Sequence, residues 1–182
     1  GGKVILTGSL GNVMKESATA AVSFIRSKSE IFNIPEKFYK ESDIHIHAPQ
    51  GAVPKDGPSA GITMTIALLS ALSDTPVKGN VAMTGEISLT GRVMPIGGLK
   101  EKTMAAYKYG MKTVIIPKEN LPDLDEIDPK VRESLDFVAV ERIEEALPIA
   151  FADDGYIKKT ETEKRKHFSG NEKSDERAAN FA

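Results

Sequence analysis

The sequence predicts an α+β or α/β fold in which short strands and helices follow one another within one compact domain. Three observations carry this prediction. The hydrophobic period switches repeatedly between two residues, typical of strands, and three to four, typical of helices. Turn-forming Gly and Pro residues stand near several switches. A chain of 182 residues, 40% of them hydrophobic, is long enough to bury a core. We expect mixed sheets packed with helices over residues 1–151.

The elements of the first half follow from local patterns. Residues 3–6, KVIL, predict a short strand. The segment 12–32 repeats apolar residues at three- and four-residue steps, which predicts an amphipathic helix ending near Asn33 and Pro35. Residues 43–48, DIHIHA, alternate strictly and predict a strand. Residues 59–72 are apolar nearly all round, so we expect a buried helix there.

In the second half, strands and helices are expected to alternate in the same way. Strands are expected at 81–84 and 88–94, around turns at Gly85-Glu86 and Thr90-Gly91. Residues 98–109 have a helical pattern with Gly110 as the stop signal. The remaining expectations are a strand at 113–116, a helical and turn-rich stretch at 119–135, a strand at 137–140 and a helix at 143–151. We find no internal repeat.

Composition limits the chemistry. The net charge of -2 gives no electrostatic reason to expect nucleic acid or a membrane as the partner. The absence of Cys excludes thiol catalysis and disulfides and suits a reducing, cytoplasmic location. No apolar run approaches the roughly 20 residues that a membrane span needs. The chain begins at Gly1-Gly2 without Met or a signal-peptide pattern, so we expect an excised domain.

The segment 152–182 is rich in charges of both signs and poor in large apolar residues. Such a composition buries little surface, so we expect a flexible tail or a loosely held helix. Its KRKH run could contact nucleic acid, but neighbouring acidic residues cancel the field.

The stretch AVPKDGPSAG, residues 52–61, places Ser59 directly after Gly57-Pro58, a signal for the start of a helix. Free backbone N–H groups and the positive end of the helix dipole gather in the first turn, where they would stabilise an oxyanion. The small neighbours Ala60 and Gly61 would let a substrate backbone come close. The alternative is that Ser59 only helps to begin the helix, so the presence of a base decides between the two interpretations.

Histidine is one source of a base. The Ser-x-x-Lys pattern is absent from the sequence. His45 and His47 share one face of the expected strand, so a histidine base stays open, although no third group is evident to orient it. The chain has no His-x-x-x-His spacing and no Cys, which disfavours a metal. We expect neither metal nor cofactor in this domain.

Lysine is the other source, and the run GGLKEKTMAAYKYG contains several. A lysine near its reference pKa of about 10.4 is almost fully charged at neutral pH, so a lysine base needs a lowered pKa, through burial among apolar groups and a nearby helix start. Lys102 fits best because it lies in the first turns of the helix that begins near Gly98. The residues expected to face inward beside it are Leu99, Thr103 and Ala106. Lys100 and Lys108 are expected to be solvated, and solvation is also the alternative for Lys102.

Three segments carry a family resemblance: DIHIHAPQGAVPKDGPSAGITM, VAMTGEISLTGRVMPIGGLKEKTMAAYKYGMKTVIIPKEN and VERIEEAL. Together they resemble the proteolytic domain of the Lon family of ATP-dependent serine proteases, over residues 7–150. The PKDGPSAG form is similar to the soluble bacterial and mitochondrial branch. The resemblance implies a fold like domain 2 of ribosomal protein S5, with Ser59 as nucleophile and Lys102 as its base.

The resemblance also implies roles for neighbouring residues. The hydroxyl of Thr84, in MTGE, would help to orient the lysine, unless Thr84 is an ordinary strand residue. Asp56 would pair with Lys102 in a resting state or would cap the helix that begins near Ser59. His45, His47 and Glu86 remain candidates for supporting positions around the site.

The family enzyme is a homohexamer whose ATPase ring unfolds proteins and threads them to the proteolytic sites. The chain has no G-x-x-x-x-G-K-[ST] loop, so we expect ATP and Mg to be used by a missing ATPase module N-terminal to Gly1. The expected substrates are unfolded proteins or peptides. Two alternatives remain open. One is a non-catalytic assembly or binding module on the same fold. The other is a small-molecule kinase of the wider superfamily, for which no glycine-rich phosphate loop is visible.

Overall fold

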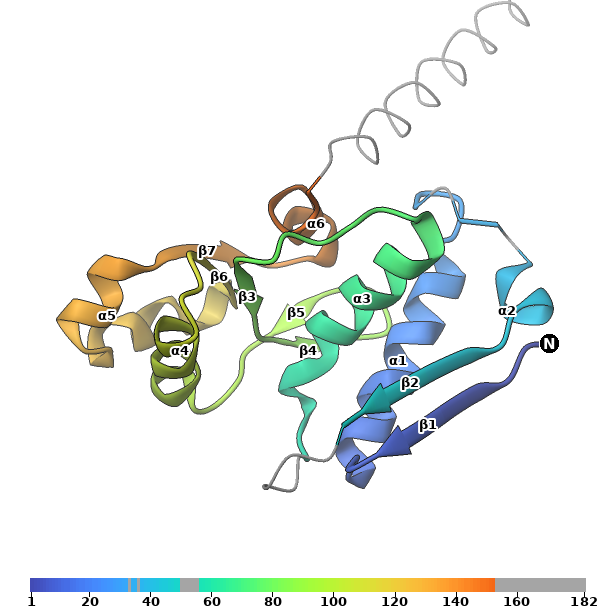
Figure 1. Ribbon diagram of the computed structural model, residues 1–182, viewed down its shortest axis with the longest axis horizontal. Coiled ribbons are helices and arrows are strands. Elements are labelled where there is room, and N and C mark those ends of the chain that lie inside the picture. The colour runs from blue at the N-terminus through green and yellow to red at the C-terminus, as the bar shows by residue number, and fades with distance from the viewer. Residues whose placement is uncertain (33, 36, 50–55, 153–182) are drawn as a thin grey trace, which may run out of the picture.

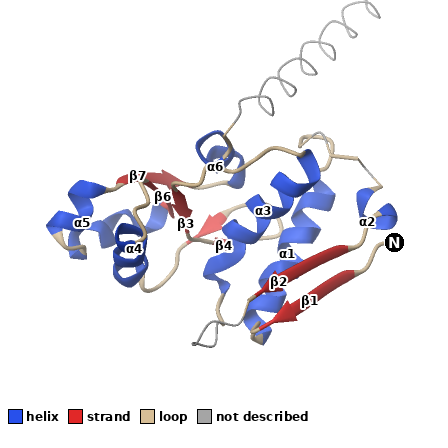
Figure 2. Cartoon of the chain, viewed as in Figure 1, coloured by secondary structure: helices blue, strands red, loops and turns tan. Residues whose placement is uncertain are grey.

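The computed structural model describes residues 1–32, 34–35, 37–49 and 56–152 and shows the expected α+β fold (Figures 1 and 2). In chain order the elements are β1 (Val4–Gly8), α1 (Asn12–Ser27), α2 (Phe38–Glu41), β2 (Ile44–Ala48), η1 (Pro58–Ala60), α3 (Gly61–Ser73), β3 (Val81–Met83), β4 (Glu86–Ile87), β5 (Val93–Met94), α4 (Leu99–Lys108), β6 (Thr113–Pro117), η2 (Lys118–Glu126), α5 (Pro129–Ser134), β7 (Asp136–Val140) and α6 (Ile143–Ala150). The expected tail lies outside the described residues from 153 onward.

A three-stranded parallel sheet, in the order β3-β6-β7, is covered by helices on both faces. Side chains alternate along β6, because successive residues of a strand point to opposite faces. Ile115 belongs to the hydrophobic cluster that contains α1, α3 and α6. Val114 and Ile116 belong to a second cluster, formed with α4, η2 and α5. The middle strand is therefore buried on both sides, and β3 forms one edge of the sheet.

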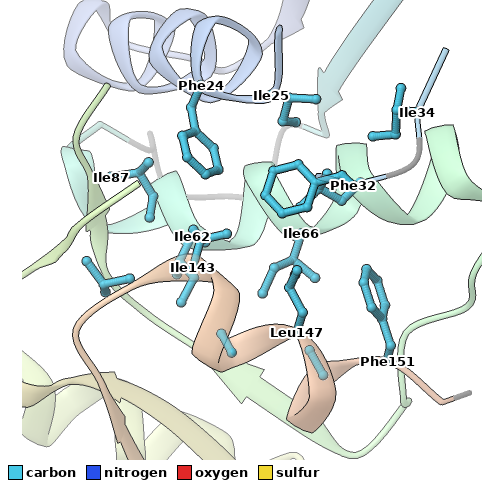
Figure 3. Packing of buried hydrophobic residues seen from close by; sticks show 14 of the residues in the cluster. Phe24, Ile25, Phe32, Ile34, Ile62, Ile66, Ile87, Ile143, Leu147 and Phe151 are labelled. Carbon is cyan, nitrogen blue, oxygen red and sulfur yellow. The ribbon is translucent and has the colours of Figure 1, made fainter. Parts of the chain in front are cut away.

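The larger cluster joins three helices that are distant in sequence. Figure 3 shows Phe24 of α1, Ile66 of α3 and Leu147 of α6 among the side chains packed in this core. All three are at most 2% exposed. Full burial of such side chains contributes about 1.5–3 kcal/mol each. This packing fixes α3, and with it the turn that precedes α3, against the sheet.

Two smaller sheets complete the fold. Strands β1 and β2 pair in parallel, and β4 and β5 form an antiparallel hairpin. Glu86, expected in a turn, instead pairs with Met94 in this hairpin. None of the helices in the described part of the chain is long and apolar enough to cross a bilayer.

The helix expected at 12–32 ends earlier, at Ser27. The hydroxyl of Ser27 donates to Phe24 O (2.8 Å), and Phe32 N donates to Lys28 O (3.2 Å) in a separate turn. Serine side chains that bond to nearby backbone carbonyls compete with helix propagation. Phe32 still reaches the core, where its ring packs edge-on against Phe24 with centroids 5.6 Å apart. The apolar period therefore identified a buried residue correctly but placed it in the wrong element.

Helix α3 was expected to be a buried helix, and it is buried on one side only. Its residues Ile62, Ile66 and Leu69 are buried, whereas Thr63 and Ala67 are exposed in this single chain. The short helix α2 was not expected at all, because a four-residue helix shows no periodicity.

Candidate active site

A pocket of about 240 Å³ opens where α3 and α4 approach the edge strand β3. The helix α3 lies on one face of the sheet and α4 on the other, so the pocket joins the two layers. It is lined by Ser59, Ala60, Thr63, Ala82, Met83, Thr84, Lys102, Ala106 and Val114. Both residues that the sequence singled out for catalysis, Ser59 and Lys102, are therefore brought to one pocket from positions far apart in the chain.

Ser59 lies in the 3₁₀ turn η1, directly before α3. Pro58 opens this turn, as its fixed φ and missing N–H favour, and Gly57 before it has φ 135°, a conformation that favours glycine. The carbonyl of Ser59 accepts hydrogen bonds from Gly85 N (2.9 Å) and from Thr84 Oγ1 (3.3 Å). The backbone that carries the serine is thus tied to the segment that follows β3.

Lys102 lies in the first turn of α4. Its Nζ donates to Gly97 O at 3.2 Å, in the turn that leads into the helix. Leu99, Thr103 and Ala106 are buried beside it, which confirms the expected inward face. Lys102 itself is exposed in this chain, so the burial expected for a lysine base is not seen. The reason is geometric, because its side chain lines the open pocket instead of the packed side of α4. Lys100 and Lys108 are exposed, as expected.

Thr84 is 4% exposed and lines the same pocket. The resemblance implied that its hydroxyl orients Lys102, but the hydrogen bond found for this hydroxyl goes to Ser59 O. Thr84 is therefore placed to hold the serine backbone, whereas Lys102 is held through Gly97 O.

The structure gives a packing reason for glycine at position 61, which sequence reasoning missed. A Cβ added to it would lie 2.9 Å from Ile87 N, a backbone atom of β4 that cannot swing aside as a side chain does. The small residue was expected to let a substrate approach. Instead, Gly61 is buried and lets the start of α3 pack against β4.

Asn120 in η2 is a further residue that sequence reasoning missed. Its side chain accepts from Ile96 N (3.0 Å) and donates to Ile96 O (2.8 Å), as a neighbouring strand would. It also donates to Asp123 Oδ2 (2.6 Å), and it is only 3% exposed. Because Ile96 directly precedes Gly97, this clamp fixes the turn whose carbonyl holds Lys102. No motif marks Asn120, since its role depends on a contact 24 residues away.

The histidines lie on a different surface. His45 Nε2 and His47 Nδ1 both hydrogen-bond to Thr7 Oγ1, at 2.7 Å and 2.8 Å, on the exposed face of the β1–β2 sheet. They share one face as expected, but neither lines the pocket of Ser59 and Lys102. Within the described ranges, no three His, Cys, Asp or Glu side chains are grouped to hold a metal ion.

A second hollow, of about 380 Å³, lies at the start of η2 and is lined by charged residues of both signs. Lys118 Nζ donates to Glu141 Oε1 at 2.7 Å. This hydrogen bond raises the pKa of Lys118 and lowers the pKa of Glu141. Arg92 and Glu119 approach to 3.8 Å nearby. Exposed pairs of this kind contribute little to stability.

Comparison of the sequence with known proteins identifies the family of this chain. Residues 1–153 match the family described as Lon protease (S16) C-terminal proteolytic domain. The chain is 59% identical over 146 residues to Lon protease of Finegoldia magna, covering 80% of this chain and 19% of that protein. It is 56% identical over 154 residues to Lon protease of Clostridioides difficile, covering 85% and 20%. It is also 56% identical over 146 residues to Lon protease 1 of Myxococcus xanthus, covering 80% and 18%.

These matches define a proteolytic domain of the S16 class. The chain belongs to the Lon protease family. It spans about a fifth of the length of the curated relatives that it matches.

Proposed function

We propose that this chain is the serine endopeptidase domain of an ATP-dependent Lon protease, with Ser59 as nucleophile and Lys102 as general base. The single observation that supports this most is that both side chains line one pocket, although they come from opposite layers of the fold. A nucleophile and a base must lie within reach of the same reacting atom, and the shared pocket favours this pair over the histidines.

In the proposed reaction, the neutral amine of Lys102 takes the hydroxyl proton of Ser59 while Oγ attacks the carbonyl carbon of a peptide bond. The C–N bond then breaks, and the ammonium of Lys102 gives its proton to the leaving amine. Water next attacks the Ser59 ester, with Lys102 accepting a proton from the water. The C–Oγ bond breaks, and the proton returns to Ser59, which restores both groups.

The surrounding groups support each step. Ser59 lies in the turn before α3, where the positive end of the helix dipole favours the oxyanion of the tetrahedral intermediate. The lining residues Ala60, Ala82 and Val114 are apolar, so the pocket can accept an apolar part of an unfolded peptide. Thr84 keeps the serine backbone in place through Ser59 O.

The wider activity belongs to a longer protein. We propose that an ATPase module precedes this domain, that it uses ATP and Mg, and that the complete enzyme is a cytoplasmic homohexamer acting on unfolded or misfolded proteins. The match to a C-terminal proteolytic domain and the fraction of each relative that is covered support this arrangement.

The test replaces Ser59 with Ala in the protein that carries this domain. We expect peptide hydrolysis to be lost and folding to be retained, because the hydroxyl at the start of a helix contributes little to packing. Ser23→Ala is the matched control, since Ser23 is exposed on α1 and its hydroxyl bonds only to Thr19 O among the described contacts. Peptidase rate and thermal unfolding are measured for both variants.

A fluorophosphonate label separates the enzyme from a non-catalytic assembly module on the same fold. The enzyme should form a covalent adduct on Ser59 that mass spectrometry locates, and Ser59→Ala should not form it. Retained cleavage by Ser59→Ala, or no adduct in the complete oligomer, would leave the assembly module as the better account.

A further inference from the structure

The segment that leads into Ser59 is attached to a helix from a distant part of the sequence. Asp56 Oδ1 accepts a hydrogen bond from Met14 N at 3.0 Å, in the first turn of α1, and a second from Gly57 N at 2.9 Å. Met14 and Asp56 are 42 residues apart. The same carboxylate oxygen therefore bonds both the beginning of α1 and the backbone just before the Ser59 turn.

Helix α1 lacks a cap of its own. Gly11 occupies the N-cap position, no side chain at that position makes a capping hydrogen bond, and the first turn contains no acidic residue. The first N–H groups of a helix have no partner within the helix, and a carboxylate there also interacts favourably with the helix dipole. Asp56 supplies that partner from outside the helix.

Gly11 carries an independent signature of this contact. A Cβ at this position would lie 2.0 Å from Asp56 Cγ and 2.2 Å from Asp56 Oδ2. The φ of Gly11 is -69°, so the backbone itself would accept any residue. Glycine is required here only because the Asp56 side chain occupies the space.

The geometry points to Asp56 as a positioning residue that anchors the Ser59 turn to the start of α1, and not as a charged partner of Lys102. Together with the hydrogen bonds from Gly85 and Thr84 to Ser59 O, this anchor holds the nucleophile's turn at two points. The inference rests on the proposed function of Ser59. A displacement of about 1 Å in a reacting group can cost about 100-fold in rate, so loss of one anchor should reduce turnover.

The test compares Asp56→Ala with Asp56→Asn in the protein that carries this domain. Asp56→Ala should lower kcat for a peptide by about 10- to 100-fold with a smaller change in KM. Asp56→Asn retains an oxygen acceptor and caps helices about as well as Asp, so it should recover most of the rate with an unshifted pH profile. Asp128→Ala is the matched control, because Asp128 caps α5 through Lys130 N (2.9 Å), outside the pocket lining. It should reduce stability without lowering kcat.

A double-mutant cycle combines Gly11→Ala with Asp56→Ala, because a methyl group at position 11 would overlap the Asp56 side chain. Gly11→Ala should reduce kcat because the new methyl group displaces the Asp56 side chain. In the Asp56→Ala background, the same change should have little further effect. Hydrogen exchange at Met14 N–H gives a readout that does not need activity: exchange should be faster in Asp56→Ala and unchanged in Asp128→Ala.

Two results would overturn this inference. One is wild-type kcat in Asp56→Ala. The other is an Asp56→Asn variant as slow as Asp56→Ala with a displaced pH profile, which would indicate a charge interaction with Lys102. Failure of the proposed function has a different signature, namely turnover that survives in Ser59→Ala.

Discussion

Lys102 donates to Gly97 O and lines the pocket with an exposed side chain, so its place depends on a single described hydrogen bond. The proposed base role requires this side chain to be uncharged, because only a neutral amine can accept a proton.

Lys102→Arg should therefore be inactive. A guanidinium stays protonated throughout the working pH range and cannot act as a base. Removal of general-base catalysis typically costs about 10²- to 10⁴-fold, so we expect a loss of that size in kcat for a small peptide. Lys108→Arg is the control, since Lys108 is exposed near the end of the same helix. Turnover by Lys102→Arg near that of the wild type would contradict the base role.

The residues that could be predicted from sequence are those whose chemistry is local. Ser59 follows a helix-start signal, and Lys102 lies shortly after a glycine pair. These local signals made both residues candidates, and the family resemblance then favoured the catalytic interpretation over a purely structural one. Asn120 and the role of Asp56 could not be found in this way. Asn120 contacts Ile96 and Asp56 contacts Met14 across long stretches of chain, and no local pattern encodes either contact.

At the scale of elements, η2 acts on the site through Asn120. Its amide satisfies both backbone groups of Ile96, just before the turn that holds Lys102. Asn120→Ala would leave these groups without partners, and an unsatisfied buried polar group costs about 1–3 kcal/mol. We expect a lower denaturation midpoint and a lower kcat, because Gly97 O would no longer be fixed.

The matched control for this prediction is Asn80→Ala, because Asn80 is exposed. Asn120→Asp keeps the acceptor for Ile96 N but turns a carboxylate oxygen toward Ile96 O and Asp123 Oδ2, which now accept from the amide. Its stability and kcat should fall at least as far as those of Asn120→Ala, because the new buried oxygen repels both acceptors. Unchanged kcat in a destabilised Asn120→Ala would show that η2 supports the fold alone.

Element types were more predictable than element ends. The strands at β2, β6 and β7 and the helix α4 lie close to the expected positions, because alternation and a glycine stop are local signals. The end of α1 was misplaced, since Phe32 continues the apolar period after the helix has ended at Ser27. Burial of Phe32 is set by tertiary packing, which the period reports without distinguishing a helix from a turn.

At the scale of the molecule, the pocket lined by Ser59 and Lys102 lies at the edge of a sheet and is open to solvent in this chain. The exposed side of α3, which includes Thr63 and Ala67, begins directly after the Ser59 turn. The described part of this single chain leaves both of these residues uncovered. In the complete enzyme, neighbouring subunits and the ATPase module are proposed to support the turn.

We therefore expect the isolated chain to be a weaker peptidase than a longer form that carries the ATPase module, at matched subunit concentration. Its residual cleavage should not respond to ATP. The loop expected to relax without its neighbours covers residues 52–57, of which 52–55 lie outside the described residues. Peptide hydrolysis with and without ATP is measured for both forms. Equal rates would mean that this domain organises its own site completely.

Within the motif PSAG, Gly61 and Ser59 are under different constraints: Gly61 is needed for packing, and Ser59 for the proposed chemistry. We expect a copy of this domain that loses the hydroxyl of Ser59 to keep its fold, whereas a copy that gains a side chain at Gly61 must move β4 away from α3. Over evolutionary time, the glycine should therefore outlast the serine in lineages that abandon peptide cleavage. A decayed member of the family would be recognised by PxAG in place of PSAG, with the packing residue intact and the nucleophile gone.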